Sequence, residues 1–186
     1  MMPPFRFPRR SLIFLLSVCL PAAWLAWCWS VPAAAQAQAP LWRSIGPYGG
    51  SARAFAAVPG DPQHVYLGDA ANWIFESRDG GAHWTRLSRV GGADEQADLI
   101  VDSIVVDESD SNTLFAGVWR VDAPDGDLYV SHDGGRNWKT IPALHGQSIR
   151  SLAQAPSNAD VIVVGSLKGV YRSKDHGANW ELISPP

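Results

Sequence analysis

Short apolar runs separated by turn-forming residues recur along the chain from about residue 52 onward. The runs alternate apolar and polar positions or are rich in Val, Ile, Phe, Tyr and Trp, as β-strands are. Gly, Pro, Asp and Asn stand between them, where tight turns require them. Because no segment carries a helical apolar period of useful length, the pattern predicts an all-β chain.

An eight-residue box punctuates these runs three times. It reads SRDGGAHW at 77–84, SHDGGRNW at 131–138 and SKDHGANW at 173–180, so the shared pattern is Ser-x-Asp-x-Gly-x-x-Trp. The repeated positions are Ser77, Asp79, Gly81, Trp84, Ser131, Asp133, Gly135, Trp138, Ser173, Asp175, Gly177 and Trp180. Three apolar runs precede each box and a fourth starts at its Trp, which gives four expected strands per repeat.

The repeats divide the chain into units of about 51–88, 100–142 and 148–184. A further copy of the run after the box, WRSI at 42–45, has no box before it. Four short strands per unit are typical of a β-propeller blade, and blades stack because one cannot bury its own faces. We therefore expect strand 42–45 to be the fourth strand of another blade.

Three blades and one extra strand fall short of the four to eight blades of a closed propeller. We therefore expect a partial propeller. We expect either an N-terminal piece of a longer propeller or an open arc that self-associates to complete the ring. Self-association would cover the exposed blade face, which is expected to be apolar.

The box itself has the composition of a structural turn. Asp79 can accept turn N–H groups, Gly81 can take a positive φ, and Trp84 offers a large plate for packing with an N–H that needs a partner. A phosphate loop would be followed by a helix and a calcium loop would hold several acids, whereas each box holds one acid and precedes a strand. We therefore expect neither a metal nor a cofactor at the boxes.

Three histidines lie in or beside the boxes, at positions that differ between the copies. They are His83, His132 and His176. We expect all three to be exposed turn residues, not metal ligands.

The N-terminal segment 1–37 reads as a secretory signal peptide. Three arginines precede an apolar run, and Ala35-Gln36-Ala37 offers a cleavage site. We therefore expect an exported repeat region over 38–186; the alternative is an uncleaved segment that anchors the protein in a membrane.

Cleavage would also change the composition of the chain. Both cysteines lie in the removed segment, so the exported part would have no disulfide. Of the 15 Lys and Arg residues, three arginines would be lost, which leaves 12 basic residues against 18 acidic ones. This acidic balance argues against a nucleic-acid partner and against a polybasic membrane patch.

On its three boxes, the region 42–184 resembles the Asp-box, or bacterial neuraminidase repeat (BNR), propellers. Such repeats occur in sialidases, in sortilin-type receptors, in xyloglucan-cleaving hydrolases and in the photosystem II stability and assembly factor family. The resemblance implies a β-propeller with its boxes on the outer rim, away from the ligand site.

Two classes of function remain open under this resemblance. The one we favour is a non-catalytic scaffold that binds an unknown protein or carbohydrate ligand. The other is a glycosidase, sialidase-like or xyloglucanase-like, whose catalytic residues lie partly in missing blades. The chain has no Arg-Ile-Pro motif of the sialidase type, and no motif surrounds the carboxylates outside the boxes. These carboxylates are Asp69, Asp102, Asp107 and Asp122, and we expect no catalytic residue among them.

The candidate ligand site is the mouth of the central channel, which first strands line. Arg53, Asp102 and Arg150 occupy corresponding positions in the three expected first strands. Two arginines in this register can face the channel and receive an anionic partner, and Trp119 beside Arg120 can stack a sugar or an aromatic ring. The alternatives are ordinary polar strand ends and inter-blade packing. The two loops that lengthen the second unit, 91–98 and 120–127, are further candidates for specificity.

Overall fold

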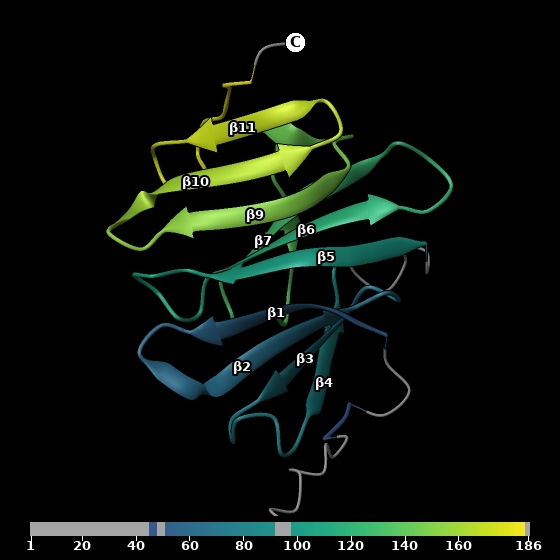
Figure 1. Ribbon diagram of the computed structural model, residues 1–186, viewed down its shortest axis with the longest axis vertical. Coiled ribbons are helices and arrows are strands. Elements are labelled where there is room, and N and C mark those ends of the chain that lie inside the picture. Colours follow the sequence, from purple (N-terminus) through teal and green to yellow (C-terminus); the bar gives the residue numbers. More distant parts are fainter. Residues whose placement is uncertain (1–44, 48–50, 92–97, 185–186) are drawn as a thin grey trace, which may run out of the picture. The chain divides into compact units, whose positions relative to one another are not determined.

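The computed structural model describes residues 45–47, 51–91 and 98–184 (Figure 1). The predicted signal peptide 1–37 and most of the predicted strand 42–45 lie outside these residues, and Ile45 has no strand assignment. Within the described part of the chain, no helix is long and apolar enough to cross a membrane.

Three four-stranded antiparallel sheets follow one another along the chain, and in each sheet every strand pairs with its neighbour in sequence. The first sheet contains β1 (Ala52–Val58), β2 (Asp61–Asp69), β3 (Trp73–Ser77) and β4 (Thr85–Arg89). The second contains β5 (Leu99–Val106), β6 (Leu114–Arg120), β7 (Gly126–Ser131) and β8 (Lys139–Thr140), followed by a 3-10 turn, η1 (Pro142–Leu144). The third contains β9 (Ile149–Ala155), β10 (Asn158–Ser166), β11 (Gly169–Ser173) and β12 (Glu181–Leu182). The prediction of an all-β partial propeller with four-stranded blades is confirmed.

The sheets stack through their faces, with the first strands β1, β5 and β9 next to one another (Figure 1). One apolar cluster fills the junction between the first two blades, and a second fills the next junction. The first includes Tyr66, Ile74, Val101, Ile104, Leu114 and Tyr129. The second includes Phe115, Leu128, Ile141, Ile149, Ile162 and Val164. The core therefore lies between blades, as the small size of each unit requires.

Two glycines allow the blades to approach closely. A Cβ atom on Gly68 would lie 2.5 Å from Cγ1 of Val101, and one on Gly117 would lie 2.5 Å from Cγ2 of Ile149. The second strands of the first two blades, β2 and β6, thus each receive a β-branched side chain from the first strand of the next blade. Because the first strands are packed in this way, their polar residues come close together across blades.

The three boxes share one hydrogen-bond pattern. The Ser hydroxyl donates to the Asp Oδ1 at 2.8–2.9 Å and accepts the Gly N–H four residues after the Ser at 2.8–2.9 Å. The Asp Oδ1 accepts the N–H of the residue four positions after it at 2.8–2.9 Å. The Ser hydroxyl therefore stabilises the turn itself, because its donor and acceptor bonds both lie inside the box.

Carboxylates that accept several hydrogen bonds are stabilised in their charged form. Bonds from the backbone N–H and the side chain of His83, and from Ser77, lower the pKa of Asp79 to about 2. The Asn137 side chain, with further bonds from the Asn137 N–H, Ser131 and the Arg136 N–H, lowers the pKa of Asp133 to about 2.

Two of the three box Trp residues, Trp138 and Trp180, pack against the apolar clusters between blades. Trp138 packs against the first cluster, and its Nε1 donates to Ser88 Oγ of the preceding blade at 3.1 Å. Trp180 packs against the second cluster and donates to the Gly177 carbonyl at 2.9 Å. The outermost strand begins one residue after each Trp, not at it, because the ring folds back over the box glycine.

One box histidine differs from the expectation of an exposed turn residue. His176 adopts a positive φ of 60° and its Nε2 lies 2.6 Å from Oδ2 of Asp107, a buried carboxylate of the second blade. The expectation is wrong here because stacking brings the third box over the end of β5, a contact that spacing along the chain does not reveal. His83 and His132 are exposed, as expected.

Candidate ligand-binding site

Stacking of the first strands brings Arg53, Asp102 and Arg150 together. Arg53 donates through Nε to Asp102 Oδ1 at 3.1 Å, and its second guanidinium nitrogen lies 3.0 Å from the same oxygen. Arg150 Nε lies 3.3 Å from Asp102 Oδ2. The two arginine side chains are 40% and 41% exposed, whereas that of Asp102 is 14% exposed. One carboxylate thus holds two guanidinium groups, which leaves an excess of positive charge at the surface.

Trp119 and Arg120, at the end of β6, extend this group of residues. The guanidinium carbon of Arg150 lies 3.7 Å from the centroid of the Trp119 ring, which is a stacking contact between the third blade and the second. Arg120 lies beside Asp125, with Nε 3.7 Å from Oδ2. We call Arg53, Asp102, Arg150 and Trp119 the inner-strand cluster.

An open hollow of about 320 Å³ adjoins the inner-strand cluster. It is bounded by the loop between β6 and β7, the start of β9 and the turn between β10 and β11. Its lining residues are Trp119, Arg120, Val121, Asp122, Ala123, Pro124, Ser148, Arg150 and Leu167. Three of the four sequence-predicted ligand residues therefore line one hollow, and Arg53 is linked to it through Asp102.

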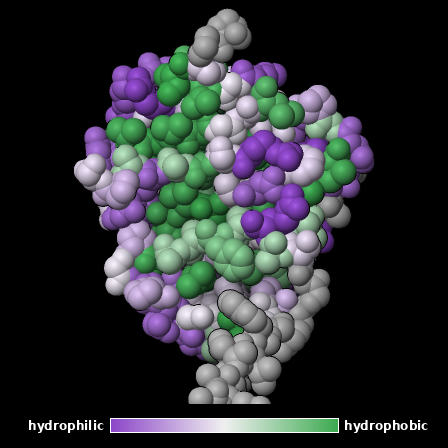
Figure 2. Space-filling view, viewed as in Figure 1, coloured by the Kyte–Doolittle hydropathy of each residue, from purple (hydrophilic) through white to green (hydrophobic). Residues whose placement is uncertain are grey.

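The first strands also carry an apolar surface. A shallow groove of about 310 Å³ runs over β1, β5 and β9, lined by Phe55, Ile104 and Leu152 among others. Figure 2 shows a hydrophobic band over these strands with a hydrophilic area beside it. A partner that lies across the first strands would therefore meet both apolar and charged groups.

Apart from Asp102, the carboxylates considered outside the boxes either accept hydrogen bonds within the fold or line the hollow singly. Asp69 accepts the N–H groups of Ala71 and Trp73 at 2.8 Å, and Asp107 accepts bonds from the Ser109 N–H, the Ser109 hydroxyl and the Gln154 amide. Asp122 is the single carboxylate among the residues that line the hollow. Over the described ranges, no group of three or more His, Cys, Asp or Glu side chains is arranged to hold a metal ion.

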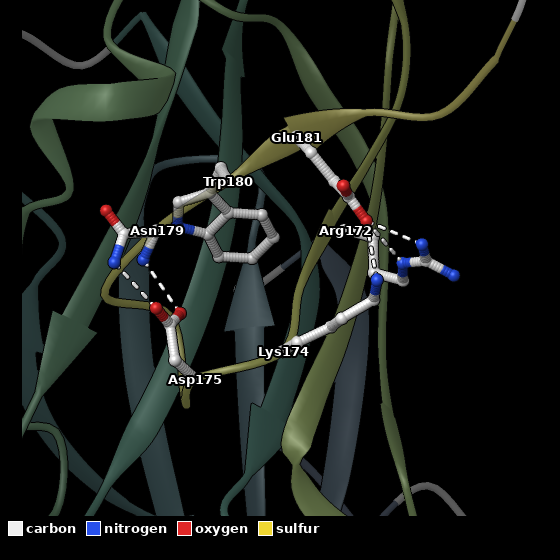
Figure 3. Close-up of a pocket in the computed structure, with 6 residues that line it drawn as sticks. All are labelled: Arg172, Lys174, Asp175, Asn179, Trp180 and Glu181. Atoms are coloured by element: carbon white, nitrogen blue, oxygen red, sulfur yellow. Dashed lines mark hydrogen bonds and ion pairs between the residues drawn. The ribbon is translucent and has the colours of Figure 1, made fainter.

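A smaller notch of about 190 Å³ lies at the third box (Figure 3). Lys174 and Arg172 both point toward Glu181, and Asn179 faces Asp175, with Nδ2 2.6 Å from Oδ2. The charged groups of this notch thus satisfy one another, so it offers a ligand less than the inner-strand cluster does.

Sequence reasoning missed Ser148 and Leu167 as members of the hollow, because they lie in two separate segments that carry no motif. Val121 lies in the loop 120–127, which the sequence analysis gave as a further candidate for specificity because the second unit is longer there.

Comparison with known proteins identifies relatives of this fold. A model of the family described as "Photosynthesis system II assembly factor YCF48" matches residues 52–184. The photosystem II assembly lipoprotein Ycf48 of Synechococcus sp. (strain CC9902) is 31% identical over 124 residues, which cover 65% of this chain and 34% of that protein. The chain therefore spans about a third of the length of this curated relative.

Solved structures agree on the fold. The structure described as YCF48 bound to D1 peptide has a TM-score of 0.55 and 24% identity, over 75% of this chain and 42% of that one. An ancestral GH74 enzyme has a TM-score of 0.56 and 25% identity, over 73% of this chain and 18% of the enzyme.

Proposed function

This chain belongs to the family described as Photosynthesis system II assembly factor YCF48, and from this premise we propose that it is an exported, non-catalytic scaffold. Its ligand is an extended protein segment with acidic residues, bound across the first strands at the inner-strand cluster. The D1 peptide bound to the related YCF48 supports a protein ligand over a carbohydrate.

The observation that carries this proposal is the sharing of Asp102 by two arginines. The ion pairs use both Asp102 oxygens, yet Arg53 and Arg150 keep further guanidinium N–H donors and remain about two-fifths exposed. Asp102 and the Trp119 ring fix these side chains before any ligand arrives, which reduces the entropy lost on binding. Carboxylates of a partner fit the remaining donors.

The glycosidase alternative finds less support in the hollow. Glycoside hydrolysis uses two carboxyl groups on opposite sides of the scissile bond, and the hollow's lining provides Asp122 alone. Hydrolysis of xyloglucan by the purified protein, abolished by Asp122→Asn, would favour the enzyme.

Export is the second part of the proposal. The description of the curated relative as a lipoprotein supports passage out of the cytoplasm. N-terminal sequencing of the protein from its host tests the expected start near Gln38, and an intact N-terminus would favour the anchored form.

The third part of the proposal is that copies of the chain associate to complete the propeller ring. A Cβ atom on Gly81 would lie 3.1 Å from Cδ1 of Ile45, and one on Gly135 would lie 3.6 Å from Cδ1 of Leu87, in the fourth strand of the preceding blade. Ile45 thus takes the place of a fourth-strand residue, which supports the assignment of segment 42–45 to another blade. Light scattering tests whether copies supply the missing strands to each other.

A binding measurement tests the ligand site. We expect fluorescence anisotropy of a labelled D1 peptide to rise with the purified protein, and Arg53→Glu or Arg150→Glu to weaken binding by about tenfold or more, or roughly 1.4 kcal/mol. Lys139→Glu, an exposed cation on the outer strand β8, is the matched control. Equal losses in all three variants would indicate a non-specific charge effect and contradict the proposed site.

A further inference from the structure

Buried polar groups without partners gather beside the hollow. Six side-chain atoms of this kind occur among the described residues, and three of them are Trp119 Nε1, Gln147 Oε1 and Ser148 Oγ. Ser148 is 2% exposed, and Ser148 and Trp119 both line the hollow. Because buried polar groups in folded proteins nearly always have partners, such a concentration calls for an explanation.

Exposed apolar side chains stand at the rim of the same hollow. Val121 and Leu167 are 57% and 65% exposed, and they come from different blades. Leu167 lies in the short turn between β10 and β11, and Val121 begins the loop between β6 and β7, so together they form two sides of the hollow. Its volume lies at the lower end of the roughly 300–1,000 Å³ of small-molecule sites, which is enough for one or two amino-acid side chains.

We propose that this hollow is an anchor subsite for one aliphatic side chain of the protein segment. The side chain lies between Val121 and Leu167, and a backbone carbonyl of the segment accepts hydrogen bonds from Trp119 Nε1 and Ser148 Oγ. This inference rests on the proposed function, because it names the residue type that the partner places next to the inner-strand cluster.

Arg150 joins the two parts of the site. It lines the hollow and also pairs with Asp102. An acidic residue beside the aliphatic one would therefore meet the free donors of Arg150, so the expected ligand carries an acidic residue next to an aliphatic residue. The hydroxyl of Ser148 can rotate about its Cα–Cβ bond to meet a carbonyl of the ligand. A purely ionic ligand outside the hollow would give no hydrogen-bond partner to Trp119 Nε1 or to Ser148 Oγ.

The loop between β6 and β7 makes this subsite specific to one blade junction. The corresponding turn in the first blade is residues 70–72, and in the third blade it is 167–168. Among the three described blades, only the second has a loop long enough to place residues such as Val121, Ala123 and Pro124 beside the third blade. The subsite therefore accounts for the longer loop of this blade.

Two capped peptides that differ at one position test the subsite. The probes are Gly-Glu-Leu-Glu-Gly and Gly-Glu-Ser-Glu-Gly, acetylated and amidated at their ends, titrated into the 15N-labelled protein. We expect the leucine peptide to bind about tenfold more tightly and to shift the indole N–H resonance of Trp119, which is assigned by its loss in Trp119→Phe. Leu167→Ser and Val121→Ser should remove the preference for leucine while they leave the affinity for the serine peptide unchanged.

Leu182→Ser is the control, because Leu182 is also an exposed leucine but lies on the outer strand β12. It should keep the preference for leucine. Equal binding of the two peptides, or a preference that survives Leu167→Ser, overturns the anchor subsite and leaves the proposed function standing. If neither peptide binds and the D1 peptide also fails to bind, the proposed function itself is overturned.

Discussion

The guanidinium carbon of Arg150 lies 3.7 Å from the centroid of the Trp119 ring, and the two residues belong to different blades. The same guanidinium pairs with Asp102, which also holds Arg53 of the first blade. Arg150, on the first strand of the third blade, thus contacts Asp102 on the first strand of the second blade and Trp119, the penultimate residue of β6. Residues from all three described blades are fixed in one place by these contacts.

Arg150→Lys should weaken peptide binding although it keeps the charge. A lysine ammonium cannot hold the Asp102 oxygen and stack on Trp119 at the same time, because it lacks the planar fork. We expect a several-fold loss of affinity for the D1 peptide and a fall of about 0.5–1 kcal/mol in the free energy of unfolding. Calorimetric titration and urea unfolding measure the two effects, and unchanged affinity would show that the stack does not position Arg150.

Asp133→Ala should destabilise the fold and leave binding intact. The Asp133 carboxylate accepts the N–H groups of Arg136 and Asn137 and the Nδ2 group of Asn137. Loss of these bonds should lower the free energy of unfolding by about 1–3 kcal/mol, toward the lower end because the carboxylate is partly exposed to water. Urea unfolding provides the measurement. Loss of peptide binding in the folded protein, without loss of stability, would mean that the box takes part in the function.

The stability of the protein should fall in acid because of the box carboxylates. The pKa values of Asp79 and Asp133 are lowered from 3.8 to about 2, chiefly by bonds from His83 and Asn137 respectively. A carboxylate with a depressed folded pKa stabilises the fold above its unfolded pKa, and this contribution disappears as the pH falls through the folded value. The loss should therefore occur between about pH 4 and pH 2.

Urea unfolding over this pH range measures the loss, and Asp133→Asn should reduce its slope. Asp127 acts in the opposite direction, since burial raises the pKa of its carboxyl and its contribution is lost as the pH rises through that raised value. An identical pH slope in the wild type and Asp133→Asn would contradict the assignment to the box.

Gly117→Ala should open the junction between the second and third blades. The added Cβ atom would lie 2.5 Å from Cγ2 of Ile149, a stiff β-branched side chain in a packed cluster. Overpacking of this kind costs about 1–3 kcal/mol, measurable as a lower melting temperature. Gly165→Ala is the control, because its Cβ atom would meet mainly the Ser151 hydroxyl of the same sheet, which can rotate away. Equal effects of the two substitutions would argue against inter-blade packing at Gly117.

The sequence was sufficient for the strands and the boxes because their signals are local. Alternating apolar positions and the spacing from Ser77 to Trp84 repeat within each unit, so the four-stranded sheets follow from each unit alone. The match of Arg53, Asp102 and Arg150 to one register also came from the repeat. That both arginines pair with the one carboxylate of Asp102 depends on the distance between stacked sheets. No local sequence pattern gives that distance.

Contacts between blades account for the remaining differences. His176 was expected to be exposed, yet it pairs with Asp107 of the preceding blade. Leu167 and Ser148 lie in unremarkable segments and meet Val121 only because the third blade packs beside the loop of the second. In a repeat fold the variable positions thus acquire partners from the next unit, and a single unit cannot predict them.

The position of the bound peptide tests the central claim most directly. A D1 peptide that carries a photoreactive group can be cross-linked to the purified protein, and the attached residues identified by mass spectrometry. We expect cross-links on β1, β5 and β9 and on the loop between β6 and β7, and their loss in Arg150→Glu. Cross-links confined to the boxes or to the outer strands β4, β8 and β12 would contradict a binding site at the inner-strand cluster.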